Sequence, residues 1–424
     1  MSAPAPVGVP PVSVQKYGGT SVGSTERLQH VAGRIAARAA GGDRIVAVVS
    51  AMGKTTDSLV ALAGEITATP AGREYDMLLA SGEIVSAALL AMAIEEHDVP
   101  AIALTGQQAG VFTDDTHTRA RITRIETDRI LTELGRGQVV IIAGFQGITP
   151  GSDFTTLGRG GSDTSAVALA AALHAVRAEI YTDVDGVYTT DPRIEPRARR
   201  LHDIAYEEML ELASQGAGVM HPRAVELGLL YDLPILVASS FREDVPGTLI
   251  RKQVQMEPSN RVRGIALDRD VALITIRAVP DRPGIASQVF GPLAEAGINV
   301  DTIVQNASAE RLTDMTFSVA HDQAAAAHAL CRDGADDLGA SDVILDEHAA
   351  KVSIVGTGMQ SGVGYAAKMF RALAEAAINI ELISTSEIRI TAIVHEDDGQ
   401  AAAQVLHAAF ELDEPVLAGE AAPG

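Results

Sequence analysis

Apolar and polar positions in the first 250 residues follow two periodicities, one typical of strands and one typical of helices. Val12–Lys16 alternates with period two and predicts a strand, whereas the segment from about Ser24 to Ala39 has the spacing of an amphipathic helix. Further strands are predicted at Ile45–Ser50, Ala101–Leu104, Val139–Ala143, Glu179–Thr182 and Ile235–Ala238, and further helices at Ala80–Glu96 and Ser162–Ala175. This alternation predicts an α/β fold with a mainly parallel sheet covered on both faces. Ligands of such sheets bind at the carboxyl ends of the strands.

The second half of the chain repeats itself. Phe290…Val300 returns as Phe370…Ile380, with Ile298 matching Ile378 at an offset of 378 − 298 = 80 residues. Each copy reads strand, loop, amphipathic helix and strand, which is long enough for a small α+β domain. A polar stretch after Pro246-Gly247 predicts a linker. We therefore expect a Pro-rich tail (1–11), an α/β domain (12–250), a linker (251–263) and two repeat domains (264–340 and 345–418).

Composition narrows the class of protein. The chain has 424 residues, of which 47% are hydrophobic, so it can bury substantial cores. Its formal charge of −22 argues against a nucleic-acid surface. The single cysteine, Cys331, excludes an intrachain disulfide framework and fits a reducing compartment. We expect no membrane-spanning run and no secretory signal, hence a cytoplasmic protein.

One glycine-rich stretch, Thr156–Ala172, precedes an Ala-rich apolar run. Three glycines (158, 160 and 161) surround Arg159, and Ser162 or Asp163 is predicted to cap the helix that follows. A helix N-terminus beside an arginine suits an anion. An ordinary glycine loop before a capped helix fits this stretch equally well.

Other polar residues follow predicted strands. Lys16 and the Gly18-Gly19 pair close the first strand and can contact phosphate oxygens, although their spacing is not that of a Walker loop. Ser50 and Thr56 follow the second strand. Glu83 lies in an apolar helical segment, where it could hold an ammonium group or simply face solvent. The turn-rich loop Thr182–Arg193 carries several acidic residues, but it lacks the full ligand set of a calcium loop.

Taken together, KYGGTS (16–21), TTLGRGGSD (155–163) and YTDVDGVYTTDPR (181–193) resemble the aspartate kinases of the amino-acid kinase family, and the resemblance covers nearly the whole chain. It implies a three-layer α/β/α kinase domain followed by two α+β ACT domains. It also implies transfer of the γ-phosphoryl group of ATP to the β-carboxylate of L-aspartate, the first step of lysine, threonine and methionine biosynthesis.

The resemblance assigns roles to matching residues. Lys16, Arg159 and Asp163 fall at catalytic positions, with Asp163 orienting Lys16. The positions that contact ATP are Lys16, Tyr17, Gly18, Gly19, Thr182, Asp183, Tyr188, Asp191 and Arg193. The positions that hold aspartate are Ser50, Thr56, Glu83, Arg159, Gly160, Gly161 and Ser162. Arg159 would pair with the α-carboxylate, and Glu83 would receive the α-ammonium.

This chemistry needs no general base. A carboxylate with an unperturbed pKa near ~3.9 is already ionised at neutral pH. The enzyme has to hold two anions together and neutralise charge on the transferring phosphoryl group. Lysine, glycine N–H groups, a helix N-terminus and Mg²⁺ carried by the nucleotide can do so, and we expect no dedicated protein metal site.

One position departs from the family pattern. Many relatives have a nucleotide-contacting lysine before the Val-Leu-His-Pro segment, whereas Gly218 stands at that position here, in GAGVMHPR. Arg223 is a candidate to replace that contact.

The repeats resemble paired ACT domains, which implies feedback regulation by lysine, threonine or both. Effector-contacting positions in the first copy are Asp281, Arg282, Pro283, Gly284, Ile285, Ala286, Asn299, Asp301 and Gln305. Those in the second are Asn379, Ile380, Ser386 and Glu387. The resemblance also implies a homodimer or an α2β2 assembly, the latter through an internal start at Met256. The duplication could instead serve only to cover sheet edges and support a dimer.

Two other functions remain open from the sequence. One is a kinase for another small carboxylate, such as glutamate or N-acetylglutamate. The other is a catalytically silent amino-acid sensor, which Gly218 motivates.

Overall fold

The computed structural model describes residues 11–252, 262–305, 312–360 and 362–414. Most of the expected tail, much of the expected linker and Met256 lie outside these ranges. The described residues form two compact units. The first comprises the chain up to Val187, Arg200–Ala213 and the segment from Gly218, and the second comprises Tyr188–Arg199, Ser214–Ala217 and the chain beyond residue 261.

An eight-stranded sheet runs through the first unit, in the order β10-β12-β11-β9-β1-β2-β6-β3. Its strands are β1 (Val12–Tyr17), β2 (Arg44–Val49), β3 (Ala101–Leu104), β6 (Val139–Ala143), β9 (Ala178–Thr182), β10 (Asp203–Ala205), β11 (Ile235–Ser239) and β12 (Thr248–Arg251). All neighbours are parallel except β11 and β12. The predicted α/β fold with a mainly parallel sheet is therefore confirmed.

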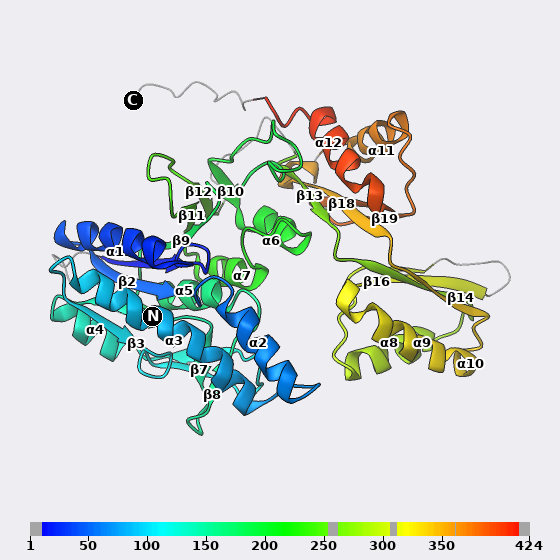
Figure 1. The fold of residues 1–424 in the computed structure, drawn as a ribbon. Helices are drawn as coiled ribbons and strands as arrows, with labels where there is room; N and C mark the ends of the chain where they lie inside the picture. The colour runs from blue at the N-terminus through cyan, green and yellow to red at the C-terminus, as the bar shows by residue number, and fades with distance from the viewer. Residues whose placement is uncertain (1–10, 253–261, 306–311, 361, 415–424) are drawn as a thin grey trace. The chain divides into compact units, whose positions relative to one another are not determined.

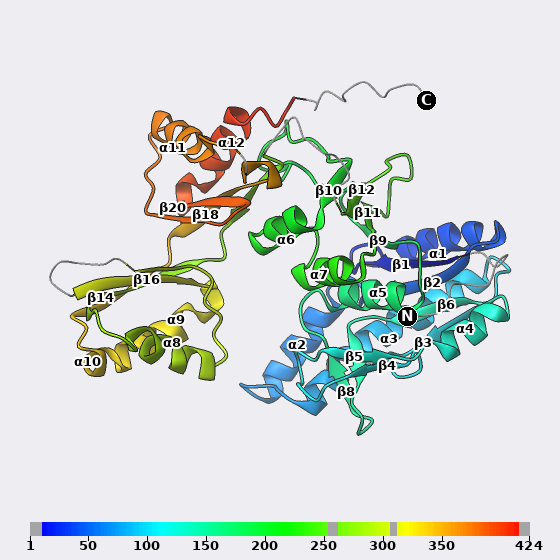
Figure 2. The same cartoon turned by 180° about the vertical axis from the view of Figure 1, so that it is seen from behind.

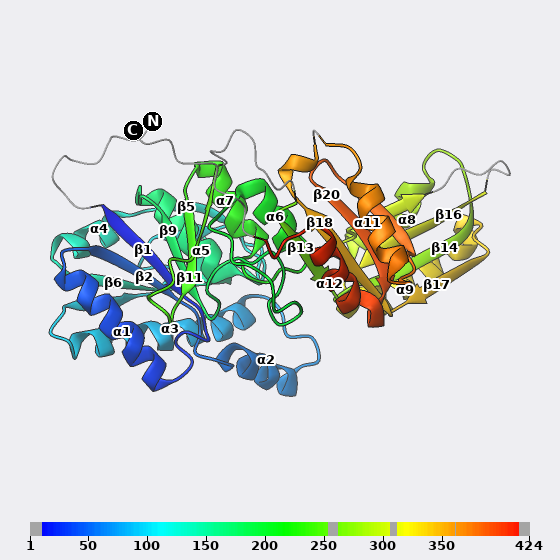
Figure 3. The ribbon, with the colours of Figure 1, turned by 90° about the horizontal axis from the view of Figure 1, so that it is seen from above.

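Helices cover both faces of this sheet (Figure 3). Helices α1 (Thr25–Ala40) and α3 (Arg73–Glu95) lie on one face, and α5 (Gly161–Ala172) and α7 (Pro222–Tyr231) lie on the other. The remaining helices around this sheet in the chain up to Ser214 are α2 (Thr55–Ile66), α4 (Asp128–Gly135) and α6 (Tyr206–Ser214). The apolar faces of α1 and α3 bury residues such as Ile35 and Leu90 against β1, β2 and β6.

Helix α3 is longer than its apolar run suggested, because it begins seven residues before the predicted start at Ala80. Among the described helices it alone is long and apolar enough to cross a membrane by length and composition, whereas no such segment was expected from the sequence. Half of that stretch is buried inside the protein, and the helix carries two buried carboxylates, Asp76 and Glu83. These features are those of a core helix.

A second, small sheet in this unit was not predicted. It has the order β5-β4-β7-β8 and consists of β4 (Val111–Thr113), β5 (Ile122–Ile125), β7 (Gln146–Ile148) and β8 (Phe154–Thr156). Figure 2 shows β4, β5 and β8 together. These strands have three or four residues each, too few for a period-two pattern to stand out. The sheet matters because β8 leads directly into the glycine-rich loop before α5.

The second unit contains two four-stranded sheets, each with helices on one face (Figure 1). One has the order β15-β16-β14-β17, formed by β14 (Ala272–Pro280), β15 (Ile303–Gln305), β16 (Leu312–Val319) and β17 (Asp342–Asp346), with helices α8 (Ile285–Glu295), α9 (Ala324–Asp333) and α10 (Ala335–Leu338). The other has the order β13-β18-β20-β19, formed by β13 (Gly264–Asp268), β18 (Ala349–Val355), β19 (Leu382–Thr385) and β20 (Arg389–His395), with α11 (Tyr365–Glu375) and α12 (Gly399–Ala409). Short 3₁₀ turns occupy His321–Gln323, Thr357–Met359 and Glu396–Asp398.

The 80-residue repeat is visible in these elements. Helices α8 and α11 begin at 285 and 365 and end at 295 and 375, an offset of 80 at both ends. Gly284 and Gly364 precede them with nearly equal positive φ angles of 93° and 94°. Strand β13, at the start of the first expected repeat domain, instead pairs with β18 in the second sheet. Sequence spacing alone could not show that a strand from the first repeat pairs in the sheet of the second.

Candidate functional site

Lys16 and Asp163 form an ion pair at the carboxyl end of the sheet. Lys16 is near the end of β1 and Asp163 is in the first turn of α5, with Nζ 2.6 Å from Oδ1. Their side chains are only 12% and 13% exposed. Asp163 therefore fixes the Lys16 ammonium at the N-terminus of α5, where the helix dipole also favours an anion.

The loops after β1 and β2 lie against one another beside this pair. The Gly53 N–H donates to the Gly19 carbonyl at 3.0 Å. A Cβ at residue 19 would lie 2.8 Å from the Ala51 carbonyl oxygen, so only glycine fits there without a shift of the backbone. Ser50 begins this second loop, and Thr56 lies in the first turn of α2.

Glu83 points from α3 to the same loop. Its Oε1 accepts the Ala51 N–H at 3.1 Å, and the residue is 3% exposed. Its Oε2 has no hydrogen-bond partner within the part of the chain that the structure describes. Burial raises the pKa of this carboxyl from 4.5 to about 7, and the Ala51 hydrogen bond opposes that rise. A buried carboxyl with one free oxygen is suited to receive a ligand's cationic group.

The loop between β8 and α5 is shaped by Gly160. This residue has φ 67° and stands at the N-cap of α5, so the prediction that Ser162 or Asp163 caps the helix was wrong. Both side chains lie inside the first turn because the helix is capped at Gly160, two residues before Ser162. A Cβ at residue 160 would come within 2.2 Å of the His221 side chain. His221 was not predicted from the sequence, and burial lowers its pKa.

Two arginines of this region, Arg159 and Arg223, differ in their hydrogen bonding and exposure. Arg159 is exposed. Arg223 donates from Nη1 to the Leu157 carbonyl at 2.9 Å and from Nη2 to the Ala120 carbonyl at 2.8 Å. Since its guanidinium holds the backbone of the glycine loop, Arg223 is not available to replace the lysine missing at Gly218. Gly218 itself is exposed.

The residues expected to contact the nucleotide divide between the two units. Thr182 and Asp183 end β9 in the first unit, where Thr182 Oγ1 donates to Asp183 Oδ1 at 3.2 Å. Tyr188, Asp191 and Arg193 belong to the second unit. There Arg193 binds the Asp191 carboxylate at 2.6 Å, and this pairing holds the pKa of Asp191 below its usual range.

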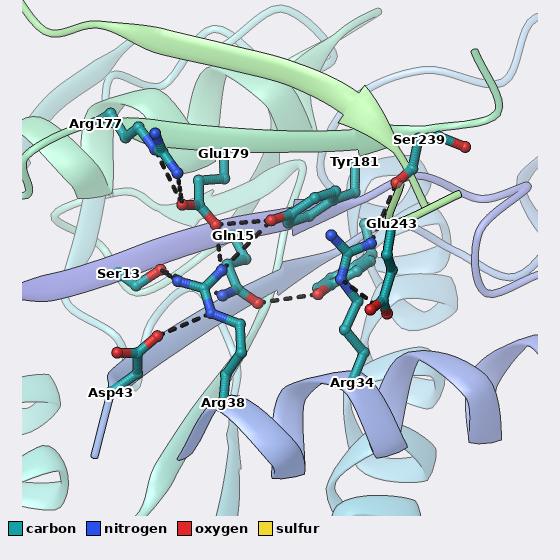
Figure 4. Close-up of polar contacts among 11 residues, drawn as sticks. Ser13, Gln15, Arg34, Arg38, Asp43, Arg177, Glu179, Tyr181, Ser239 and Glu243 are labelled. Carbon is teal, nitrogen blue, oxygen red and sulfur yellow. Dashed lines mark hydrogen bonds and ion pairs between the residues drawn. The ribbon is translucent and has the colours of Figure 1, made fainter. Parts of the chain in front are cut away.

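A polar network supports β1 from the opposite face of the sheet (Figure 4). The Glu179 carboxylate accepts from Arg38 at 2.6 Å, from Arg177 at 2.9 Å and from the Tyr181 hydroxyl at 2.9 Å. Burial by itself would raise the pKa of Glu179, but the Arg38 hydrogen bond and charge hold it below 4.5. Arg38 also bonds to Ser13 on β1. The network thus ties α1, β1 and β9 together behind Lys16.

The expected effector residues lie in three places: at the start of α8 (281–286), in the segments after α8 and α11 (Asn299, Asp301, Gln305, Asn379 and Ile380), and between β19 and β20 (Ser386 and Glu387). Most of them are exposed, whereas Ile285 is buried in the core of its domain. Asp301 forms an ion pair with Lys351 of β18, a residue that is 5% exposed. Glu387 accepts a hydrogen bond from Gln360 at 3.1 Å. Lys351 was not predicted from the sequence, because nothing in its strand pattern distinguishes it from a solvated lysine.

Residues 11–252, 262–305, 312–360 and 362–414 contain no group of three or more histidine, cysteine or carboxylate side chains placed to hold a metal ion.

Comparisons with known proteins agree with this arrangement. Residues 11–239 match the model of the amino acid kinase family, and residues 273–327 and 352–410 match ACT domain models. The chain is 48% identical over 409 residues to an aspartokinase of Pseudomonas aeruginosa, covering 96% of this chain and 99% of that protein.

Solved structures give the same result. E. coli aspartokinase III in complex with aspartate and ADP has a TM-score of 0.79 at 29% identity, covering 94% of this chain and 99% of that one. The same enzyme in complex with lysine and aspartate has a TM-score of 0.73 at 28% identity, covering 94% and 99%.

Proposed function

The chain belongs to the amino acid kinase family and, within it, to the aspartokinases, and from the arrangement of its site we propose how it transfers the γ-phosphoryl group of ATP to the β-carboxylate of L-aspartate. The observation that carries this proposal is the buried Lys16–Asp163 pair at the N-terminus of α5, with Glu83 of α3 bonded to the neighbouring loop. A cation at a helix N-terminus suits a transferring phosphoryl group, and a buried carboxyl suits a free amino group.

Charge neutralisation is the main task of the protein in this reaction. The acceptor carboxylate is already ionised, so no residue has to remove a proton. Lys16 neutralises charge on the phosphoryl oxygens, and Asp163 holds its ammonium in place. The N–H groups of Gly18, Gly19 and the first turn of α5 add further donors.

L-Aspartate is held by the two charged groups on its α-carbon, which leaves its β-carboxylate free to accept the phosphoryl group. Glu83 receives the α-ammonium, and the exposed Arg159 closes on the α-carboxylate. Ser50, Thr56, Gly160, Gly161 and Ser162 complete the aspartate site. The pairing of Glu83 with a free ammonium favours aspartate over an N-acetylated acceptor, and the relation to aspartokinases favours a kinase over a silent sensor.

ATP contacts Lys16, Tyr17, Gly18, Gly19, Thr182, Asp183, Tyr188, Asp191 and Arg193. Mg²⁺ enters with the nucleotide, and when bound it shields charge between the phosphate oxygens. The protein contributes cations and N–H donors around it.

The ACT domains bind the feedback effector. The lysine complex of E. coli aspartokinase III supports lysine as one effector, and threonine remains the second candidate. Asp281, Asp301 and Glu387 are the acidic residues suited to an ammonium group. The enzyme works in the cytoplasm as a homodimer or as an α2β2 assembly.

A panel of acceptors tests this function. ADP release is measured with L-aspartate, L-glutamate and N-acetyl-L-glutamate at equal concentration. L-Aspartate should give the highest kcat/KM. Preference for N-acetyl-L-glutamate would contradict the proposed role of Glu83, and preference for L-glutamate would contradict aspartate as the acceptor. No ADP release with any acceptor would favour the sensor.

A further inference from the structure

A buried carboxylate that has no role in the mechanism above lies at the start of α3. Asp76 is fully buried, and its two oxygens accept four hydrogen bonds. Oδ1 accepts from Thr156 Oγ1 at 2.5 Å and from the Thr118 N–H at 3.1 Å, and Oδ2 accepts from the same N–H at 3.0 Å. His117 Nδ1 lies 2.8 Å from Oδ2. A carboxylate so removed from water persists only where such donors compensate it.

The backbone that Asp76 holds is strained. Thr118 has φ 68°, a left-handed conformation that is unfavourable for a β-branched residue. Such conformations persist where surrounding contacts over-determine them, and they concentrate at functional sites. Asp76 supplies that constraint by accepting the Thr118 N–H with both oxygens.

The same carboxylate also binds Thr156, next to the loop that carries Arg159. Thr156 is the last residue of β8 and directly precedes the Leu157–Gly161 loop that carries Arg159. The Ala120 N–H donates to the Thr156 carbonyl at 2.9 Å. Arg223 then joins the Ala120 and Leu157 carbonyls. Asp76 therefore holds both backbone segments beside this loop, one at Thr118 and the other at Thr156.

Asp76 also shares a helix with Glu83. The two residues are 83 − 76 = 7 positions apart, or about two turns, so their side chains leave the same face of α3. One carboxylate holds the loop that carries Arg159, and the other faces the ligand. The distance between the two groups proposed to hold aspartate thus depends on how firmly α3 is bound to that loop.

We propose that Asp76 is a positioning residue for the amino-acid acceptor, which sets Arg159 relative to Glu83 without touching the substrate. This inference rests on the proposed function, since it assigns Arg159 and Glu83 to the α-carboxylate and the α-ammonium of aspartate. It makes a specific statement about kinetics: loosening the anchor weakens binding of the acceptor and leaves binding of ATP unchanged.

The test compares Asp76→Ala, Asp76→Asn and Thr156→Val in the full-length enzyme. Asp76→Asn keeps one acceptor oxygen, and Thr156→Val removes one donor at constant shape. The KM for aspartate should rise by about ten-fold or more in Asp76→Ala and by less in the two conservative variants, while the KM for ATP stays within about two-fold. The double variant Asp76→Asn/Thr156→Val should raise the aspartate KM by less than the product of the single effects, because both act on one contact.

A second readout does not depend on activity. Arg159 is exposed, so trypsin cleavage after this residue reports the mobility of its loop. Cleavage should be faster in Asp76→Asn and Thr156→Val than in the unmutated protein. Glu133→Gln is the matched control, because Glu133 is also a buried carboxylate (2% exposed) but pairs with Arg129 and Arg136 on α4.

The outcomes are distinct. An unmutated enzyme that fails to phosphorylate aspartate contradicts the proposed function, and the trypsin result still decides whether Asp76 anchors the loop. Unchanged cleavage in both conservative variants overturns the inference. A parallel rise of the KM values for aspartate and ATP also overturns it, as does an equal effect of Glu133→Gln, because either would indicate general loss of structure.

Discussion

Replacing Glu83 with glutamine should change both the stability and the substrate binding of this enzyme in a pH-dependent way. Burial raises the pKa of Glu83 from 4.5 to about 7. The folded protein therefore retains this proton to a higher pH than the unfolded chain does. The stability linked to Glu83 is fully present below pH 4.5 and is lost as the pH rises through 7.

The size of the effect follows from the two pKa values. The difference is 7 − 4.5, about 2.5, which at ~1.36 kcal/mol for each pKa unit gives about 3 kcal/mol as the cost of ionising the buried carboxyl. Glutamine keeps an oxygen for the Ala51 N–H and never ionises. Glu83→Gln should thus match the unmutated protein at pH 5 and exceed it by roughly 2–3 kcal/mol at pH 8.

Urea unfolding at a series of pH values from 5 to 8 measures this difference, and subtraction of the two proteins cancels the other titrating groups. In the same window the KM for aspartate of the unmutated enzyme should rise as the pH falls below 7, since a protonated Glu83 cannot pair with an ammonium. Glu83→Gln should have a high KM with little pH dependence. Parallel stability curves for the two proteins would refute the reasoning about burial.

Three further predictions concern other parts of the molecule. Gly160→Ala places a Cβ within 2.2 Å of His221 at φ 67°, so it should lower the free energy of unfolding by at least about 2 kcal/mol. Gly64→Ala is the control, because residue 64 on α2 has open space around it, and it should not lower that free energy. Equal melting curves for the two variants would contradict the account of the loop. Arg159→Ala should raise the KM for aspartate by about 10–100-fold without lowering the melting temperature, because Arg159 is exposed; near-normal aspartate kinetics would remove it from the site. Asp281→Ala should weaken inhibition by the effector. Lys351→Met should strengthen inhibition by lysine but not by threonine, because it frees Asp301 for the side-chain ammonium that lysine has and threonine lacks; inhibition curves unchanged in both variants would place the effector elsewhere.

Sequence patterns identified the elements with the strongest periodicity. Ala101–Leu104 and Val139–Ala143 were predicted with their observed bounds, because each is a continuous apolar run between polar segments. The repeat predicted the 80-residue offset of α8 and α11 for a similar reason, since both helices keep the same apolar spacing and the same preceding glycine.

Features that depend on contacts distant in sequence were not accessible. The N-cap of α5 was misplaced because Ser and Asp are common caps, whereas the left-handed Gly160 is imposed by the neighbouring loop and by His221. The sequence allowed Arg223 to bind a ligand, whereas in the structure its guanidinium donates to two backbone carbonyls. Asp76 lay four residues before the predicted start of its helix at Ala80, so the pattern did not mark it as a buried carboxylate. Its partners, Thr118 and Thr156, are 42 and 80 residues away.

Trapping of the product tests the central claim most directly, namely that Lys16 and Asp163 carry phosphoryl transfer to the side-chain carboxylate of aspartate. With ATP, Mg²⁺, L-aspartate and hydroxylamine, the unmutated enzyme should form the β-hydroxamate of aspartate, since hydroxylamine captures an acyl phosphate. Lys16→Met and Asp163→Asn should each reduce this product by at least about 100-fold while the protein remains folded. Hydroxamate formation at the unmutated rate in either variant, or no hydroxamate from the unmutated enzyme, would contradict the account.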